Sequence, residues 1–168
     1  MKEYLIKNGH HKPVGIHLGL TFTNKITFKA SFDPSCLYHF GDVDDYDTNK
    51  LCGFSSTWNH MIQSARVGWR SLDGKTIQIL TYTHSQHQIS LNEIYILGVV
   101  NPNEVFYCTI ENVRYMFRYS FQKENYSNIV TLSNIKTPDW FPFHYYLFPF
   151  FGGNKTAPHD MKIYLKTL

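Results

Sequence analysis

Cysteine is scarce in this sequence, and no long apolar run interrupts it. The three cysteines, Cys36, Cys52 and Cys108, are odd in number and far apart in a chain of 168 residues. Small secreted disulfide scaffolds are denser in cysteine and usually contain an even number. A membrane span needs about 18 continuous apolar residues, and no segment approaches this length. Residues 1–7 lack the apolar stretch of a signal peptide. We therefore expect free, buried thiols and a soluble cytoplasmic protein without a membrane partner.

Clusters of positive charge are also missing. Sixteen Lys and Arg residues against thirteen Asp and Glu residues give a net charge of only +3, and the basic residues are scattered along the chain. Proteins that recognise nucleic acid usually concentrate Lys and Arg on one face or in one run. This distribution argues against sequence-specific nucleic-acid binding.

Helical periodicity is nearly absent, and strand-like alternation takes its place. Aromatic residues make up 17% of the chain, and they fit the pleated, half-buried surface of a sheet better than a helix. Residues 114–121 are the clearest example, because a strand there would place Tyr115, Phe117, Tyr119 and Phe121 on one face. The pattern is typical of an all-β chain.

Segments of this kind recur at intervals of roughly ten residues, separated by turn signals. The expected strands occupy residues 25–32, 51–58, 64–71, 76–85, 94–100, 105–112, 114–121, 129–135, 143–150 and 160–166. Such spacing predicts an all-β, single-domain antiparallel β-sandwich of jelly-roll type over residues 25–168. Residues 1–24 are expected to form an irregular N-terminal lead-in with one edge strand at most.

The best-defined local unit is a hairpin that turns at Asp73-Gly74, a strong signal for a two-residue turn because Gly accepts positive φ. A two-residue turn pairs Arg66 with Thr81. Its core face would carry Val67, Trp69, Leu80 and Tyr82, and its opposite face Ser64, Arg66, Gly68, Arg70, Thr81 and Thr83. The opposite face is rich in hydrogen-bond donors. On a concave sheet it would hold an anionic or polyhydroxylated ligand, and on a convex sheet it would simply be solvated.

Several residues on and near this hairpin have the chemistry of a binding site for an anion. Arg66 and Arg70 offer charge-assisted donors to a phosphate or carboxylate, while histidines add hydrogen bonds and aromatic rings add a stacking surface. The candidate ligand-binding residues are Trp58, His60, Arg66, Arg70, Thr81, His84 and Tyr145.

Metal, cofactor and catalytic motifs are not recognisable. His84 and His87 would face opposite ways in a regular strand, and no Cys or carboxylate stands beside them to complete a metal site. The acidic loop at residues 41–47 lacks the later Gly and Glu of a calcium loop. No Gly-x-Ser-x-Gly motif is present. The sequence therefore assigns no metal ligand, no cofactor and no catalytic residue.

Three segments resemble a family of short, uncharacterised bacterial and phage β-proteins. They are Lys50-Leu-Cys-Gly-Phe-Ser, Ser64-Ala-Arg-Val-Gly-Trp69, which is similar to SARFGW in that family, and Leu147-Phe-Pro-Phe-Phe-Gly-Gly-Asn-Lys-Thr-Ala-Pro-His-Asp160, which is similar to PYFGG…APHD. The likeness covers about residues 25–168. It implies no catalytic residues, and it favours a small cytoplasmic or phage-encoded accessory protein.

Together these patterns favour a non-enzymatic ligand-binding module for a polar, anionic small molecule, either a nucleotide or an acidic sugar. A phage-encoded protein of this kind would sequester a host nucleotide signal. One alternative is a small hydrolase or lyase acting on a glycan or phosphodiester, with His60, Arg66, Tyr82 and His84 as its reactive groups. Another is a structural or interaction protein, such as a phage accessory protein that buries its aromatic C-terminal edge against another chain. A homo-oligomer is compatible with each alternative.

Overall fold

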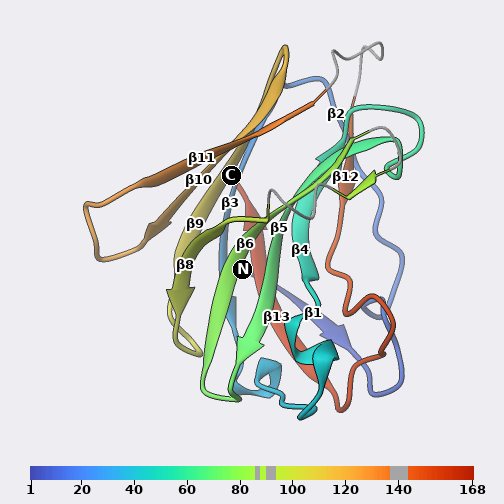
Figure 1. Cartoon of the computed structure of the whole chain (residues 1–168), viewed down its shortest axis with the longest axis vertical. Coiled ribbons are helices and arrows are strands. Elements are labelled where there is room, and N and C mark those ends of the chain that lie inside the picture. The colour runs from blue at the N-terminus through green and yellow to red at the C-terminus, as the bar shows by residue number, and fades with distance from the viewer. Residues whose placement is uncertain (86–87, 90–93, 137–143) are drawn as a thin grey trace.

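Two antiparallel sheets pack face to face in a jelly-roll-like β-sandwich (Figure 1). The computed structural model describes residues 1–85, 88–89, 94–136 and 144–168. Within these residues, one sheet has six strands in the order β1-β13-β3-β9-β10-β11. The other has seven, in the order β2-β12-β4-β5-β6-β7, with β8 also paired to β6. The predicted all-β sandwich is confirmed.

The strands of the six-stranded sheet are β1 (Lys2–Ile6), β3 (Lys25–Phe32), β9 (Phe106–Val113), β10 (Met116–Lys123), β11 (Val130–Ile135) and β13 (Met161–Thr167). Those of the seven-stranded sheet are β2 (Leu20–Thr21), β4 (Asn49–Ser55), β5 (Gln63–Leu72), β6 (Thr76–Ser85), β7 (Gln88–Ile89), β8 (Ile96–Val100) and β12 (His144–Leu147). Two short 3₁₀ turns, η1 (Pro34–Cys36) and η2 (Val43–Tyr46), lie between β3 and β4. In the described part of the chain, no helix has the length and apolar character needed to cross a membrane.

The core lies between the sheets and is largely aromatic. Phe117, Tyr119 and Phe121 of β10 are buried, as the alternation predicts, whereas Tyr115 lies in the preceding turn with 52% of its surface exposed. Across the core, the Phe32 ring lies 4.9 Å from the Trp69 ring, a distance typical of favourable aromatic pairs. The three cysteines are free and buried, which agrees with the prediction.

The lead-in contributes a strand to each sheet, which is more than the sequence predicted. β1 pairs with β13 and buries Tyr4 and Ile6, while β2 pairs with β12 at the edge of the other sheet. The predicted strand at 143–150 is shorter than expected: β12 ends at Leu147, before Pro149. Proline cannot donate a ladder hydrogen bond, which accounts for the early end.

The predicted register of the central hairpin is wrong by one residue. Asp73 and Gly74 both have positive φ (51° and 62°), and the Lys75 N–H donates to the Leu72 carbonyl at 3.0 Å, which closes the expected tight turn. However, β5 and β6 pair Leu72 with Thr76. Lys75 is therefore an extra residue next to the turn, in the manner of a β-bulge.

This extra residue reverses the faces of β6 relative to the prediction, because a shift of one residue turns every side chain of a strand over. Arg66 lies opposite Tyr82 rather than Thr81, and Ser64 lies opposite His84. Tyr82 therefore joins the Arg66 face, and Thr83 turns to the core.

A hydrogen bond between side chains of the two sheets follows from this register. The Tyr119 hydroxyl of β10 lies 2.7 Å from the Thr83 Oγ1 of β6, and it donates to the Tyr82 carbonyl at 3.2 Å. Tyr119 is fully buried. An unsatisfied buried hydroxyl costs about 1–3 kcal/mol, so the pair helps to fix the two sheets relative to one another.

Replacing Tyr119 with Phe should lower the free energy of unfolding by about 1–2 kcal/mol, because Thr83 then loses its buried partner. The matched control is Tyr107→Phe, which removes an exposed hydroxyl bonded to Glu124 and should change stability by less than about 0.5 kcal/mol. Urea denaturation followed by fluorescence measures both. Equal losses in the two variants would contradict the role given to Tyr119.

Candidate functional site

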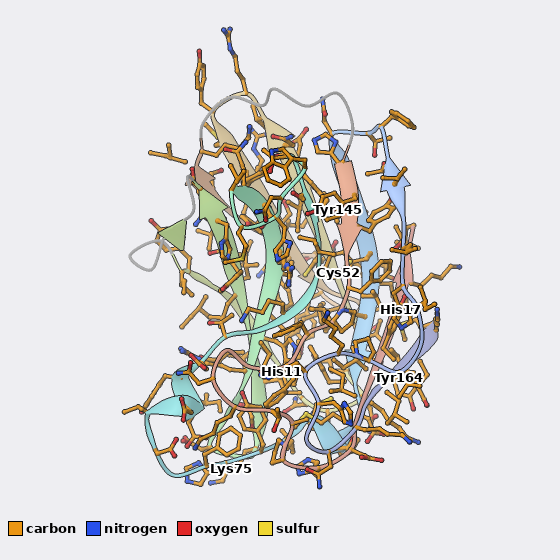
Figure 2. All side chains as sticks on the ribbon, turned by 90° about the vertical axis from the view of Figure 1, so that its right-hand side faces the viewer. His11, His17, Cys52, Lys75, Tyr145 and Tyr164 are labelled. Carbon is orange, nitrogen blue, oxygen red and sulfur yellow. The ribbon has the colours of Figure 1, made fainter. Side chains whose placement is uncertain are left out.

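Polar side chains from four neighbouring strands meet on the outer face of the seven-stranded sheet. The cross-strand partners on β12, β4, β5 and β6 form two adjacent rows, Tyr145–Ser55–Ser64–His84 and Leu147–Gly53–Arg66–Tyr82, and a further pairing joins Lys50, Gly68 and Leu80. Neighbouring strands lie about 4.8 Å apart, so the two rows bring Arg66 close to the tyrosines and His84. We call this surface the groove face; Figure 2 labels Tyr145 on it.

Three adjoining cavities open on the groove face. The Arg66 cavity has a volume of about 220 Å³ and is lined by Lys50, His60, Met61, Arg66, Tyr82, His84, Phe150, Gly152 and Gly153. The Tyr145 cavity, of about 460 Å³, shares His60, Arg66 and Phe150 with it and continues past Tyr145 to residues 12–18. The Asp47 cavity, of about 270 Å³, shares Lys50, Tyr82 and Gly153. Because they share lining residues, the three cavities lie next to one another across the strands, and we refer to them together as the groove.

Arg66 is the central charge of this groove. Only 9% of its surface is exposed. In the described part of the chain, its guanidinium forms neither a hydrogen bond nor an ion pair with another residue. Burial lowers its pKa, yet an arginine side chain stays protonated in proteins. Buried charges are normally paired, so an arginine this deeply buried without an ion pair among the described residues is unusual.

Lys50 is a second buried cation in the Arg66 cavity, and sequence analysis missed it. It is 9% exposed, its Nζ donates to the Gly152 carbonyl at 2.9 Å, and it lies 4.8 Å from the centre of the Tyr82 ring. Burial, aided by the nearby Arg66 charge, lowers the pKa of Lys50 to about 8. The available signal was a lysine inside the otherwise apolar run Lys50–Phe54, where a lysine side chain needs a special reason to be buried.

Two histidines face the groove, and each lies beside a tyrosine hydroxyl. The His60 backbone N–H donates to Tyr145 Oη at 2.8 Å, and this hydroxyl lies 3.5 Å from His60 Nδ1. His84 Nε2 lies 3.3 Å from Tyr82 Oη. Burial, together with the charge of Arg66, lowers the pKa of His84 to about 4 and also lowers the pKa of His60. Both imidazoles are therefore neutral near pH 7 and able to accept a proton or share a hydrogen bond.

The structure brings four of the predicted site residues together: His60, Arg66, His84 and Tyr145 line the groove. Residues 12–18 and 148–153 line the cavities beside these strands, and Arg66 and His84 are buried there. His60 and Tyr145 do not belong to the hairpin, and His84 reaches this face because of the one-residue shift in register.

The other three predicted residues lie elsewhere. Trp58 is 71% exposed and does not line the groove. Thr81 lies on the opposite side of β6 from Arg66 and is fully buried, and its Oγ1 accepts the Tyr95 N–H at 3.0 Å. Arg70 lines another cavity, of about 730 Å³, which shares no lining residue with the Arg66 cavity, and its guanidinium donates to the Tyr46 carbonyl there. The extra residue at the hairpin turn explains the position of Thr81.

The acidic loop uses its carboxylates for local structure. Asp42 accepts the Asp44 N–H at the start of η2, and Asp45 accepts the N–H groups of Phe40 and Gly41. Across the described residues, no group of three or more His, Cys, Asp or Glu side chains has an arrangement suited to a metal ion. His87, which the sequence analysis weighed with His84 as a possible pair of metal ligands, lies outside the described residues.

Similarity to known proteins is confined to the fold. No protein-family model and no curated protein matches the sequence. The alginate lyase from Klebsiella pneumoniae superimposes with a TM-score of 0.57 at 8% identity, over 86% of this chain and 59% of the lyase. A functionally unknown protein from Saccharomyces cerevisiae matches with a TM-score of 0.49 at 7% identity, over 99% of this chain and 88% of its own. A xylan β-1,4-xylosidase from Bacillus halodurans C-125 matches with a TM-score of 0.46 at 8% identity, over 88% of this chain and 28% of the xylosidase.

The chain therefore spans 59% of the length of the alginate lyase that it resembles, and the two share a β-sandwich architecture. At 8% identity, this likeness concerns the fold, and the chemistry of the groove must be argued from its own residues.

The pKa of His84 offers a direct test of the electrostatics of the groove. We expect its imidazole to titrate near pH 4 in the wild type. Burial is the main cause of this low pKa, so in Arg66→Gln the pKa should rise only in part, because one nearby positive charge is removed and burial remains. The matched control is Arg70→Gln, on the same strand but in another cavity, which should leave the His84 pKa unchanged. Histidine side-chain NMR over a pH series measures all three, and equal values in wild type and Arg66→Gln would contradict the arrangement.

Proposed function

We propose that the groove binds an acidic oligosaccharide and holds one of its carboxylates against Arg66. The observation that carries this proposal is the buried Arg66 guanidinium, which has no protein partner among the described residues and opens into a cavity. A guanidinium is planar and presents paired N–H donors that match the two oxygens of a carboxylate. An incoming carboxylate would neutralise a charge that the fold leaves uncompensated.

The rest of the groove supports a ligand that is anionic and rich in hydroxyl groups. Lys50 adds a second buried cation, and Lys12 lines the Tyr145 cavity, while Asp47 is the only carboxylate among the described residues that line the three adjoining cavities. The neutral His84 and the Tyr82 hydroxyl supply hydrogen-bonding groups suited to sugar hydroxyls. Phe150 offers an apolar face against which a sugar ring can pack.

The length of the groove favours an oligomer over a single nucleotide. The three adjoining cavities lie across β12, β4, β5 and β6, a span of roughly 15 Å at about 4.8 Å per strand. A chain of several sugar residues would occupy this length, whereas a mononucleotide would occupy a fraction of it. The fold it shares with an alginate lyase, an enzyme named for a polymer of uronic acids, supports the same choice.

Binding should depend on Arg66 and not on Arg70. We expect oligogalacturonate or oligomannuronate to bind the wild type, and Arg66→Gln to weaken the affinity at least about tenfold, because a hydrogen bond to a charged group contributes about 1.5–3 kcal/mol. Arg70→Gln, the matched control, should bind like the wild type. Isothermal titration calorimetry measures each affinity, with neutral xylo-oligosaccharide as the control ligand. An Arg66→Gln variant with wild-type affinity, or a wild type that binds neither acidic oligosaccharide, would refute the proposal.

A lyase is the second candidate function, favoured by the two histidine–tyrosine pairs on the strands and loop around Arg66. A carboxylate held by Arg66 would make the proton on its neighbouring carbon more acidic. A neutral imidazole would accept this proton, a tyrosine hydroxyl would protonate the leaving glycosidic oxygen, and the C–O bond would break as a C=C bond forms. The step needs no oxidant, since both products together retain all the atoms of the substrate.

Elimination leaves a conjugated double bond that absorbs ultraviolet light, which distinguishes it from binding alone. If the protein is a lyase, incubation with polymannuronate or polygalacturonate should produce this absorbance, and His84→Ala should reduce the rate at least about a hundredfold, far more than it weakens affinity. His159→Ala, which changes an exposed histidine bonded to the Ser35 carbonyl, is the control and should keep the wild-type rate. No absorbance change at any substrate concentration that saturates binding would leave the binding function and exclude these polyuronates as lyase substrates.

A further inference from the structure

Lys50 lines two of the adjoining cavities of the groove although nine-tenths of its surface is buried. It lines the Arg66 cavity together with Tyr82 and His84, and it also lines the Asp47 cavity. Lysines are almost never buried this deeply unless a charged partner accompanies them. Among the described residues, however, Lys50 forms no ion pair. Its amine is therefore an unusual group to find in the wall of a cavity.

The neighbouring backbone holds this amine in place. The Lys50 N–H donates to the Phe150 carbonyl and the Phe150 N–H donates to the Lys50 carbonyl, both at 2.8 Å. Two residues further on, the Gly152 carbonyl accepts a hydrogen bond from Lys50 Nζ at 2.9 Å. Gly152 has a φ of 70°, and a Cβ there would collide with the Lys155 carbonyl, so this turn requires glycine. One short segment thus fixes both the strand position and the amine of Lys50.

The surroundings of the amine favour its neutral form. The centres of the Tyr82 and Phe150 rings lie 4.8 Å and 5.8 Å from Nζ. Burial and then the Arg66 charge lower the pKa of Lys50 to about 8, and the Asp47 charge opposes this shift only in part. An exposed lysine has a pKa of about 10.4. Near pH 7, a much larger share of the Lys50 amine is therefore unprotonated.

A neutral lysine amine is a nucleophile. Enzymes that use lysine to attack a carbonyl group prepare it by burial in an apolar pocket or by placing another cation beside it. Both conditions hold at Lys50, since it is buried and Arg66 lines the same cavity. The Arg66 guanidinium also has the paired N–H donors that match a carboxylate. The Arg66 cavity thus combines a receptor for a carboxylate with an amine suited to react with a carbonyl group.

We propose that Lys50 forms a Schiff base with an oxo acid, a small molecule that has a carboxylate and an aldehyde or ketone group. The carboxylate would lie against Arg66 and the carbonyl carbon at Lys50 Nζ. The cavity volume of about 220 Å³ suits such a compound, since one water molecule takes up about 30 Å³ in the liquid.

The reaction is an exchange of oxygen for nitrogen on one carbon atom. The amine adds to the carbonyl carbon to give a carbinolamine, which then loses water. The carbonyl oxygen leaves with the two hydrogens of the neutral amine, and a C=N bond remains. No oxidant or reductant takes part. Protons must move between nitrogen and oxygen, and the Tyr82 hydroxyl and His84 Nε2, 3.3 Å apart in the same cavity, can transfer them.

Arg66 has the same role here as in the proposed function, that of a receptor for a carboxylate, and the inference rests on that role. Reaction at Lys50 does not require an oligosaccharide. Failure of the acidic oligosaccharides to bind would therefore leave it standing, and an unreactive Lys50 would leave oligosaccharide binding standing.

Glyoxylate with cyanoborohydride tests the reactivity of Lys50, because the hydride reduces a Schiff base to a stable secondary amine. Peptide mass spectrometry then measures the rate at each lysine of the wild type. Near pH 7, Lys50 should react at least about tenfold faster than Lys75, an exposed lysine beside the hairpin turn that Figure 2 labels. Near pH 10 this advantage should shrink, because exposed lysines then also lose their protons. Equal rates at the two lysines near pH 7 would overturn the proposal.

Arg66→Gln tests the receptor for the carboxylate. It should slow the reaction of Lys50 with glyoxylate at least about tenfold relative to Lys75 in the same sample, because a hydrogen bond to a charged group is lost. The matched control, Arg70→Gln, should react like the wild type. Acetaldehyde, which has no carboxylate, should show a much smaller difference between wild type and Arg66→Gln. Thermal melting checks that the variants fold. A folded Arg66→Gln whose Lys50 reacts with glyoxylate at the wild-type rate would refute the assignment of an oxo acid.

Discussion

The pairing of β5 with β6 determines the chemistry of the groove face. Because Lys75 is accommodated as an extra residue after the Asp73-Gly74 turn, Arg66 lies beside Tyr82, and His84 reaches the same face two residues further on. A register different by one residue would turn Tyr82 into the core and expose threonines in its place. The aromatic core between the sheets holds this register, since Trp69 and its neighbours on β5 can be buried in only one way. The Asp73-Gly74 turn and the aromatic core thus determine which side chains face the groove.

The groove concentrates positive charge: among the described residues, neither Arg66 nor Lys50 forms an ion pair. Arg66 and Lys50 are both nine-tenths buried, and Lys50 relies on a carbonyl and two aromatic rings rather than a carboxylate. Removing such charges from water is costly, and the histidines around them respond by remaining neutral. These buried charges are therefore destabilising relative to apolar side chains of similar size. Such a cost is typical of functional sites, where stability is sacrificed for ligand binding, and an anionic ligand would relieve it.

Much of the fold could be predicted from the sequence, because alternating apolar and polar residues indicate a strand with one buried face. The strands at 25–32 and 76–85 agree with the structure to the residue. The register of the hairpin could not be predicted, since a bulge of one residue leaves no mark in the alternation. His60 and Arg66 were identified by residue type. Lys50 was overlooked because the expected strand began at Leu51, whereas β4 begins at Asn49. The residues between 12 and 18 that line the groove lie in a segment without regular periodicity.

We propose that the Arg66 guanidinium receives the carboxylate of an acidic sugar. A crystal structure of the protein with a bound oligogalacturonate or oligomannuronate tests this contact most directly. We expect a carboxylate within hydrogen-bonding distance of Arg66, with the sugar chain lying in the groove between Tyr145 and Lys50. An oligosaccharide bound instead in the cavity beside Arg70, with the Arg66 cavity filled only by solvent, would contradict it.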